Sequence, residues 1–398
     1  MQTIFWTCAA LVVYAYIGYP LVLIALACVH QIATDLLFAA GRRERRHRSG
    51  RPTPSVSLIF AAHNEAEVIA EKMRNTAAID YPAESFEVLI GCDACTDETA
   101  HLARRAAMPN CRVFESAERS GKPAMLNRLV PEARGELIVF CDANTMIMPD
   151  AVRHLTQHFA SPQVGCVCGE LRLRSLDGKP QNEGAYWRYE TFLKFLESRL
   201  NMLVGANGGL FAIRRELFQP LPPHAITDDF LIAMKIRGAG MRVLYDPEAV
   251  ACEAASDMKQ EFRRRIRIGA GNFYALQYTW RMLNPAAGLI ALAYWSHKVL
   301  RWFVPFALGI SLLAAGTLAF KPFYAACLCA TTALACLIAW EHRLLRIGRS
   351  SRLLSIPYYF ASMNLALMLG LVRCMRGTQT LVWNPTPRPE VRTKGAGA

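Results

Sequence analysis

Four long apolar stretches surround a middle region of ordinary composition, and they constrain this sequence more than any other feature. The first, residues 4–29, carries no charged side chain. It exceeds the roughly 20 residues that a helix needs to cross the hydrocarbon of a bilayer. Three more follow, at residues 303–320, 323–340 and 354–372. The chain is 53% hydrophobic, and because the excess lies in these stretches, we predict a soluble domain held between transmembrane helices.

The basic segments next to these stretches predict the orientation of the chain. The charges that follow the first stretch, in residues 41–51 (GRRERRHRSGR), mark a cytoplasmic flank, so the N-terminus is expected outside. The basic linker at 341–352 is also expected inside. If all four stretches span, the basic tail lies outside, against the same rule. A re-entrant segment, or a break at Pro20, would resolve this conflict, and the side of the C-terminus stays open.

The composition divides the chain into six regions. Residues 285–300 are apolar but include His297 and Lys298, which suits a helix lying in the membrane interface; the alternative is the start of a longer span. The predicted regions are an N-terminal transmembrane helix (1–30), a basic juxtamembrane linker (31–54), a cytoplasmic catalytic domain (55–271), interfacial helices (272–302), C-terminal transmembrane helices (303–373) and a basic tail (374–398).

The formal net charge of +13 raises the question of nucleic-acid binding. The densest basic clusters, however, flank the apolar stretches. There, membrane orientation and attraction to anionic lipid headgroups account for them. We therefore expect membrane lipids, and no nucleic acid, as partners.

The middle region alternates apolar runs with amphipathic ones. Runs at 55–62, 86–93 and 136–143 read as buried strands, and helices are expected between them, one of them capped by Asn64. Continuous apolar strands separated by helices are typical of a parallel sheet covered on both faces. The predicted fold class is therefore α/β, with a parallel-rich sheet.

Polar residues follow the predicted strands, at the edge where parallel sheets bind ligands. Asp142 follows the strongest strand, Asp93 follows another, and Asn64 and Glu65 follow the first. The phosphate-binding G-x-x-x-x-G-K-[ST] and G-x-G-x-x-G patterns are absent, as is the G-x-S-x-G of α/β-hydrolases. Oxygen ligands such as Asp142 and the Asn144 amide suit Mg²⁺ or Mn²⁺ shared with a phosphate. The alternative is a helix cap followed by a turn.

Several short motifs together resemble those of the membrane-embedded family 2 glycosyltransferases, which include cellulose, hyaluronan and poly-N-acetylglucosamine synthases. They are AAHNE (61–65), CDACTDET (92–99), GKPAMLN (121–127), DAN (142–144), GANGGLFAIRRELF (205–218), TDD (227–229) and RRIRIGAG (264–271). The resemblance covers about 55–271. It implies a GT-A-type nucleotide-sugar-binding domain flanked by transmembrane helices, and an inverting sugar transfer.

The resemblance also implies roles for individual residues. Asp229 would be the catalytic base, with Asp228 beside it. Asp142, assisted by Asn144, would hold Mg²⁺ or Mn²⁺. Gly208 and Gly209 would lie on the acceptor side. The nucleotide-sugar would contact Glu65, Asp93, Lys122, Asp142, Arg264 and Arg267.

The last motif departs from the family's Q-x-x-R-W. Arg264 replaces Gln, and Ile268 replaces the Trp that helps processive synthases hold the acceptor sugar. Repeated addition is therefore in question. Arg263 and Arg265 are expected to be only a basic cytoplasmic flank.

The predicted function is metal-dependent transfer from a UDP-sugar to a saccharide acceptor, in polysaccharide synthesis at the inner membrane, with export or assembly partners. The alternative is a single addition to a lipid such as polyprenyl phosphate or ceramide. A transporter is disfavoured because the three C-terminal stretches carry no charge. A catalytically silent nucleotide-sugar-binding subunit is disfavoured because Asp93, Asp142, Asp229 and Arg267 are all present.

Overall fold

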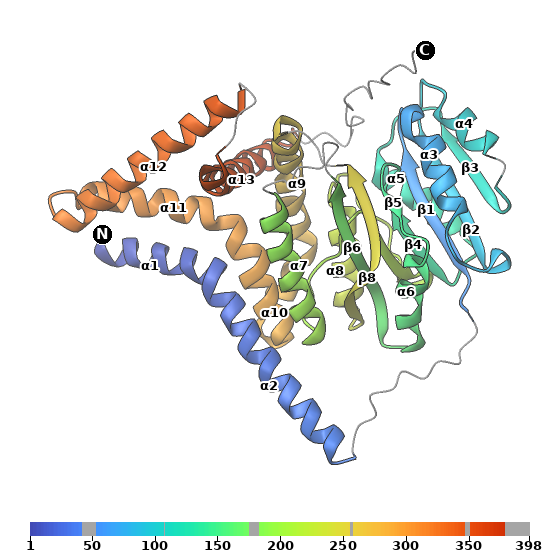
Figure 1. The fold of residues 1–398 in the computed structure, drawn as a ribbon, viewed down its shortest axis with the longest axis horizontal. Helices are drawn as coiled ribbons and strands as arrows, with labels where there is room; N and C mark the ends of the chain where they lie inside the picture. Colours follow the sequence, from blue (N-terminus) through green and yellow to red (C-terminus); the bar gives the residue numbers. More distant parts are fainter. Residues whose placement is uncertain (42–52, 107, 175–182, 255–257, 347–350, 379–398) are drawn as a thin grey trace, which may run out of the picture.

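The computed structural model describes residues 1–41, 53–106, 108–174, 183–254, 258–346 and 351–378 of the 398. Most of the basic segment at 41–51, part of the linker at 341–352 and most of the tail at 374–398 lie outside these residues. Figure 1 shows a sheet domain with a group of long helices extending away from it.

A mixed sheet forms the centre of the domain. Within the described residues it has eight strands, in the order β3-β2-β1-β4-β7-β6-β8-β5. The first four of these run parallel to one another, and β7 is antiparallel to both neighbours. The strands are β1 (Val56–Ala62), β2 (Phe86–Asp93), β3 (Cys111–Ser116), β4 (Leu137–Cys141), β5 (Met146–Ile147), β6 (Val164–Arg174), β7 (Leu210–Arg214) and β8 (Arg242–Ala254).

Helices cover both faces of this sheet, which is why β1 and β4 are buried throughout and why every residue of the two strands except Ser57 is apolar. Leu58 and Phe60 face a core shared with α3 (Ala66–Ala77), α4 (Thr99–Arg105) and α6 (Ala151–Gln157). Ile59 faces the opposite core, shared with α5 (Lys122–Glu132) and α8 (Asp228–Gly238). The prediction of an α/β sheet covered on both sides is confirmed.

Four helices are long and apolar enough to cross a membrane, within the part of the chain that the structure describes. They run over Gln2–Ala39, Leu289–Thr317, Pro322–Leu345 and Leu353–Met375. The first comprises α1 (Gln2–Val13), a π-helical turn and α2 (Tyr19–Ala39), and Pro20 does not interrupt it. The second joins α10 (Leu289–Ala293), another π-helical segment and α11 (Leu300–Thr317). Much of the stretch expected to lie in the interface is thus the start of a longer candidate span.

The third and fourth candidate spans correspond to α12 (Pro322–Arg346) and α13 (Arg352–Met375). Two further helices, α7 (Glu183–Arg199) and α9 (Met258–Thr279), connect the spans to the sheet. In Figure 1, α7 and α9 lie between the sheet and the long helices. A buried cluster that includes Tyr19, Leu193, Phe230, Phe273 and Trp302 joins the first span, α7, α8, α9 and α11. The sheet domain and the spans therefore share one packed boundary.

Helices α9 and α13 approach each other closely. A Cβ placed on Gly370 would lie 2.8 Å from the backbone nitrogen of Ala270, so a larger side chain has no room there. This contact holds α13 against the helix that carries Arg264, Arg265 and Arg267.

Candidate active site

A cavity of about 1080 Å³ connects the ligand-binding edge of the sheet to the long helices. One end is lined by residues that follow β1 and β4 and by the start of α8. The other end is lined by α7, α9 and α13, and by parts of the first two candidate spans. Ligand pockets commonly measure about 300–1,000 Å³, so this cavity has room for a nucleotide sugar and part of an acceptor.

Four of the predicted site residues meet at the sheet end of this cavity. The ammonium Nζ of Lys122 lies 2.7 Å from Oδ1 of Asp142 and 3.1 Å from Oδ2 of Asp228. A Cβ placed on Gly208 would lie 3.3 Å from Oδ2 of Asp229 and 3.8 Å from Oδ2 of Asp142. Segments far apart in the sequence therefore bring three carboxylates and one ammonium together.

The surroundings shift the pKa values of Asp142 and Asp229 in opposite directions. Burial raises the pKa of Asp229 to about 6, and the neighbouring carboxylate of Asp228 adds to the shift. Burial would also raise the pKa of Asp142, but Lys122, helped by Arg264 and Arg267, outweighs it and holds this pKa below its ordinary value. Near neutral pH, Asp142 is thus an anion suited to a cation, and Asp229 has a pKa suited to a general base.

Glu65 lines the cavity, whereas Asp93 does not. Asp93 is fully buried, and its carboxylate accepts hydrogen bonds from the backbone amides of Ser120 (2.8 Å) and Gly121 (2.8 Å) and from the Ser120 hydroxyl (3.1 Å). This geometry differs from the expected contact with the nucleoside, because the carboxylate already binds the turn before α5. Asp93 instead positions that turn, and with it Lys122.

The prediction that Asn64 caps the following helix is wrong. Helix α3 begins at Ala66, whose backbone N–H donates to Oδ2 of Asp97 at 3.0 Å. Asn64 has a φ of +53° and pairs with Thr96 in the next loop, accepting from its backbone N–H at 2.8 Å. The loops after β1 and β2 are therefore tied together beside Glu65.

The residues around Asp142 fit a divalent metal that takes most of its ligands from the substrate. Asp142 is partly exposed to the cavity, its side chain 34% accessible, and keeps Oδ2 on the side of Gly208. The amide nitrogen of Asn144 donates to Oε1 of Glu253 at 3.0 Å, which leaves the amide oxygen as its remaining ligand atom. No group of three or more His, Cys, Asp or Glu side chains able to hold a metal occurs among the described residues. Mg²⁺ and Mn²⁺ are commonly held by one or two protein carboxylates together with substrate phosphates.

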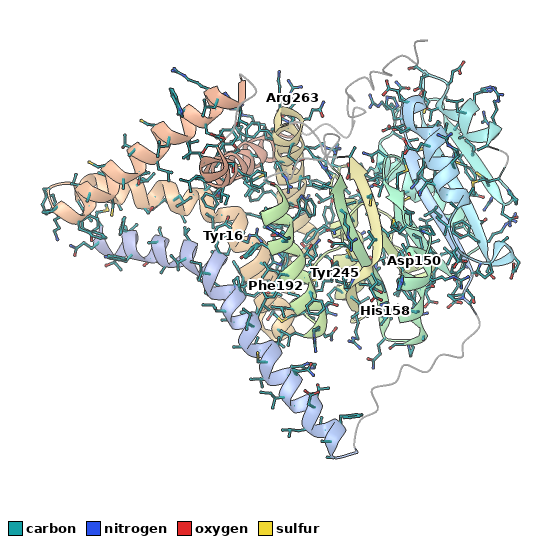
Figure 2. All side chains as sticks on the ribbon, viewed as in Figure 1. Tyr16, Asp150, His158, Phe192, Tyr245 and Arg263 are labelled. Carbon is teal, nitrogen blue, oxygen red and sulfur yellow. The ribbon has the colours of Figure 1, made fainter. Side chains whose placement is uncertain are left out.

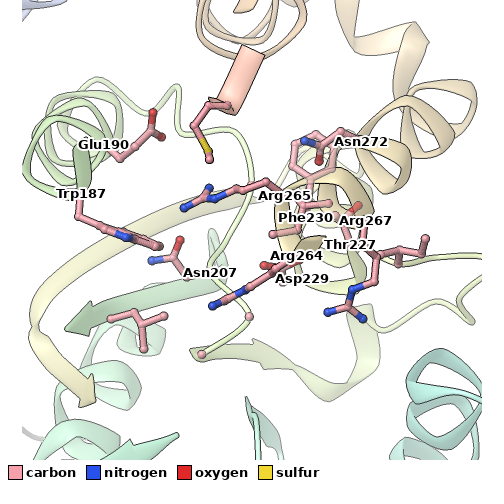
Figure 3. Close-up of a pocket in the computed structure, with 18 of the residues that line it drawn as sticks. Trp187, Glu190, Asn207, Thr227, Asp229, Phe230, Arg264, Arg265, Arg267 and Asn272 are labelled. Carbon is pink, nitrogen blue, oxygen red and sulfur yellow. The ribbon is translucent and has the colours of Figure 1, made fainter. Parts of the chain in front are cut away.

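Three arginines project from α9 toward the cavity that contains Asp229 (Figure 3). Arg264 lies 3.6 Å from Glu253 and 3.9 Å from Glu261. Arg267 forms no ion pair with the described residues. Burial and the like charge of Arg264 lower the pKa of Arg267. Among the described residues, Arg267 is therefore a cation with no ion-pair partner, which suits an anion-binding site; Asp142 and Asp228 act on it only from a longer distance.

The expectation that Arg265 belongs to an exposed basic flank is wrong. Its guanidinium bonds Glu261 at 2.5 Å and the hydroxyl of Tyr359, on α13, at 3.3 Å, and lies 5.5 Å from the ring centre of Tyr186 on α7. It thus joins three helices at the cavity wall. Arg263 is exposed as expected, near the start of α9 and at the rim of the cavity (Figure 2).

Several residues that line the cavity were not predicted from the sequence. Glu253, the last residue but one of β8, belongs to no motif that would identify it. The residues contributed by α7 and the second candidate span lie beyond or between the motifs; they include Trp187, Glu190, Lys194, His297, Lys298 and Arg301. The charges inside an apolar stretch, at 297, 298 and 301, were the one available signal.

Residues 52–271 match a family model described as "Glycosyltransferase like family 2", which is more than half of the chain. The chain belongs to glycosyltransferase family 2. The strand ends that form the cavity lie within the matched region, so the sheet domain is the glycosyltransferase domain.

Named relatives of this family 2 glycosyltransferase act on different acceptors. The β-monoglucosyldiacylglycerol synthase of Trichormus variabilis is 32% identical over 139 residues, 34% of this chain and 30% of that protein. The poly-β-1,6-N-acetyl-D-glucosamine synthase of Staphylococcus aureus (strain COL) is 27% identical over 234 residues, 56% of this chain and 55% of that protein. The matches thus span at most about half the length of these relatives.

A solved structure extends the similarity to the long helices. The mannosyltransferase PcManGT from Pyrobaculum calidifontis, in complex with GDP-Man and Mn²⁺, superposes with a TM-score of 0.69 at 25% identity. The alignment covers 94% of this chain and 99% of that one. The whole arrangement of glycosyltransferase domain and apolar helices therefore recurs in another family member.

Proposed function

We propose that this enzyme transfers a sugar from a UDP-sugar, with Mg²⁺ or Mn²⁺, to a hydroxyl group of a lipid acceptor, and inverts the sugar's anomeric centre. The observation that carries the proposal is the continuity of the cavity. It connects Lys122, Asp142 and Asp229 at the sheet to walls formed by candidate membrane spans. A donor from the cytosol and an acceptor from the bilayer would meet there.

The donor is assigned to the sheet end. Lys122, Arg264 and Arg267 supply positive charge for a diphosphate, and guanidinium groups can pair with two phosphate oxygens at once. Glu65 lies on the same wall, where the nucleoside would extend. PcManGT binds GDP-Man with Mn²⁺, which supports a nucleotide sugar with a metal. UDP as the nucleotide follows from the family resemblance.

The chemistry needs a base and a stabilised leaving group. The acceptor oxygen attacks the anomeric carbon while its proton passes to Asp229, and the bond from that carbon to the diphosphate breaks. Negative charge develops on the departing UDP, where Lys122 and Arg267 stabilise it. A metal held by Asp142, with the Asn144 amide oxygen, would act as a Lewis acid on the diphosphate.

This assignment predicts how transfer depends on pH. Because burial and Asp228 raise the pKa of Asp229 to about 6, its carboxylate is protonated below that pH and accepts no proton. We expect kcat/KM for the acceptor to fall about tenfold per pH unit below pH 6 and to level off above pH 7. Asp228→Asn removes the neighbouring negative charge and should move this limb to lower pH. A profile that does not change between pH 5 and 8 would contradict the role of Asp229.

The far wall of the cavity favours a lipid over a saccharide acceptor. Helix α13 contributes Ile356, Phe360, Met363 and Leu367, all apolar side chains on a candidate span. A hydrocarbon chain suits this wall, and the similarity to a glucosyldiacylglycerol synthase agrees with it. A saccharide acceptor remains the second candidate, supported by the longer alignment with the poly-N-acetylglucosamine synthase; it would bring the export or assembly partners of such synthases.

We place the enzyme in the inner membrane, with the catalytic domain in the cytoplasm, where nucleotide sugars are made. The basic residues after the first span support this orientation.

The test is a product assay on the purified protein in lipid nanodiscs. A panel of UDP-sugars, with GDP-mannose for comparison, is supplied with Mg²⁺, Mn²⁺ or EDTA, and nucleotide release and glycosylated products are measured with lipid extracts or oligosaccharides as acceptors. The proposal expects a glycolipid carrying one sugar, formed from a UDP-sugar only with metal. Products of increasing chain length, or transfer in EDTA, would overturn it.

A further inference from the structure

The membrane-side half of the cavity contains two ammonium groups that form no ion pair with any carboxylate of the described residues. Lys194, on α7, and Lys298, in the second candidate span, both line the cavity. Lys194 is only 7% exposed, and its ammonium donates to Oδ1 of Asn207. Lys298 has neither a hydrogen bond nor an ion pair to any residue that the structure describes. Lys298 is half-buried, and within the described structure Lys194 contacts only neutral groups: Asn207 and the rings of Trp187 and Tyr245. Cations withdrawn from water without an ion-pair partner are unfavourable, so such a pair suggests an anionic ligand.

The acidic groups nearby are already engaged. Glu190 bonds Arg301 at 2.5 Å and His297 at 3.1 Å. Glu197 accepts from the hydroxyl of Tyr19 at 2.6 Å and lies 2.7 Å from the other ring nitrogen of His297. Three permanent cations, those of Arg301, Lys194 and Lys298, thus face two carboxylates. One positive charge is therefore in excess, and neither lysine forms an ion pair with a described residue.

This charge lies next to the proposed base. Asn207, which accepts from Lys194, precedes Gly208, and Gly208 packs against the carboxylate of Asp229. The side-chain nitrogen of Asn207 is buried without a hydrogen-bond acceptor in the described structure. Figure 3 shows Asn207 between Trp187 of α7 and Asp229. A ligand bound by the lysines would therefore hold a neighbouring group close to Asp229.

We propose that the acceptor is an anionic lipid whose phosphate binds between Lys194 and Lys298 and whose headgroup presents a free hydroxyl to Asp229. The inference rests on the proposed function and names its acceptor class. The lysines act as point charges for the phosphate, and the apolar side chains of α13 face the hydrocarbon tails. A phosphate oxygen that attacked directly would already be ionised and would need no base; the base at Asp229 therefore points to a separate alcohol.

The test compares acceptors that differ in one group. Phosphatidylglycerol carries both a phosphate and an alcohol, diacylglycerol carries only the alcohol, and phosphatidic acid carries only the phosphate. The nanodiscs are made of neutral lipid, and the donor is the UDP-sugar that the product assay selects. We expect transfer to phosphatidylglycerol, little transfer to diacylglycerol, and competitive inhibition by phosphatidic acid. Inorganic phosphate should inhibit far less, because it lacks the tails. Equal transfer to diacylglycerol, glycosylation of polyprenyl phosphate in preference, or equally strong inhibition by free phosphate would overturn the proposal.

Variants test the lysines themselves. Lys298→Met and Lys194→Met should each raise KM for phosphatidylglycerol about 10- to 100-fold, the range expected for one charge-assisted contact, with KM for the UDP-sugar unchanged. Lys298→Arg should restore most of the loss. Lys321→Met, at the turn between α11 and α12 and outside the cavity, is the matched control and should behave as wild type.

The result separates two kinds of failure. If UDP does not bind in calorimetry and no lipid is glycosylated, the proposed function fails. If UDP binds and sugar is transferred, but the lysine variants keep the KM of wild type, only the anionic acceptor site is rejected. UDP binding by each variant also shows that it has folded.

Discussion

Asp229→Asn is expected to reduce sugar transfer by about 10²- to 10⁴-fold, the usual contribution of a general base, while the Kd for UDP with metal stays close to that of wild type. Asn has nearly the same shape as Asp but accepts no proton in this pH range. Asp229 lies beside Gly208, whereas the ammonium of Lys122 contacts Asp142 and Asp228 instead. Removing the charge at 229 therefore leaves the ion pairs that hold the donor end intact. The measurements are initial rates at saturating donor, and calorimetry with UDP and Mn²⁺.

A matched substitution shows whether the loss is specific. Asp150→Asn replaces an exposed carboxylate before α6, outside the cavity (Figure 2), and should keep full turnover. The acid limb of the pH profile should also disappear from any residual activity of Asp229→Asn, because the group that titrates is gone. Near-normal turnover in Asp229→Asn would reject the base. Loss of UDP binding together with turnover would instead indicate a damaged site.

The sequence predicted those parts of the site that depend on strand ends. Parallel apolar strands leave few choices about where their carboxyl ends lie, so Glu65 and Asp142 were expected at one edge, and they line one cavity. The start of α8, with Asp228 and Asp229, needed the family resemblance as well. A helix that begins with two acidic residues is common, and nothing in its own pattern shows what it faces.

Contacts between segments distant in the chain could not be predicted from the sequence. Asp93 satisfies the same strand-end rule, but the turn at 120–121 reaches it first and buries it. Arg265 has the same local pattern as the exposed Arg263. Its contacts with Glu261, on its own helix, and Tyr359, on α13, distinguish the two residues only in three dimensions. The turn that buries Asp93 and the Tyr359 contact of Arg265 both come from segments distant in the sequence.

The helix at 289–317 shows a further ambiguity. Charges at one end of an apolar stretch predict a helix at the membrane surface when they face water. Here His297 and Arg301 instead face Glu190 and Glu197 of α7, inside the protein. A surface helix and a helix packed inside the protein have the same sequence spacing. They differ only in whether another helix supplies the counter-charges, which the spacing does not show.

Asp142→Ala is expected to abolish the effect of metal on UDP binding. In wild type, Kd for UDP should be at least tenfold lower with Mn²⁺ than in EDTA. Even residues that only hydrogen-bond to a metal ligand change metal affinity by about 10- to 100-fold, so a direct ligand should have at least that effect. Lys122 holds the pKa of Asp142 low, so the carboxylate is charged and available to a cation. The variant removes that ligand, and its two titrations should give the same Kd.

The titration in EDTA distinguishes this explanation from a general collapse of the site. In wild type, Lys122 forms an ion pair with Asp142 at 2.7 Å, which partly neutralises its positive charge. In Asp142→Ala the ammonium is released toward the diphosphate, so metal-free UDP should bind at least as tightly as to wild type. Asn144→Ala is the matched comparison and should lose less of the metal effect, because Asn144 is neutral and its amide nitrogen is bound to Glu253. Unchanged metal-dependent affinity in Asp142→Ala would contradict the assignment, since a cation held by the diphosphate alone would not need this carboxylate.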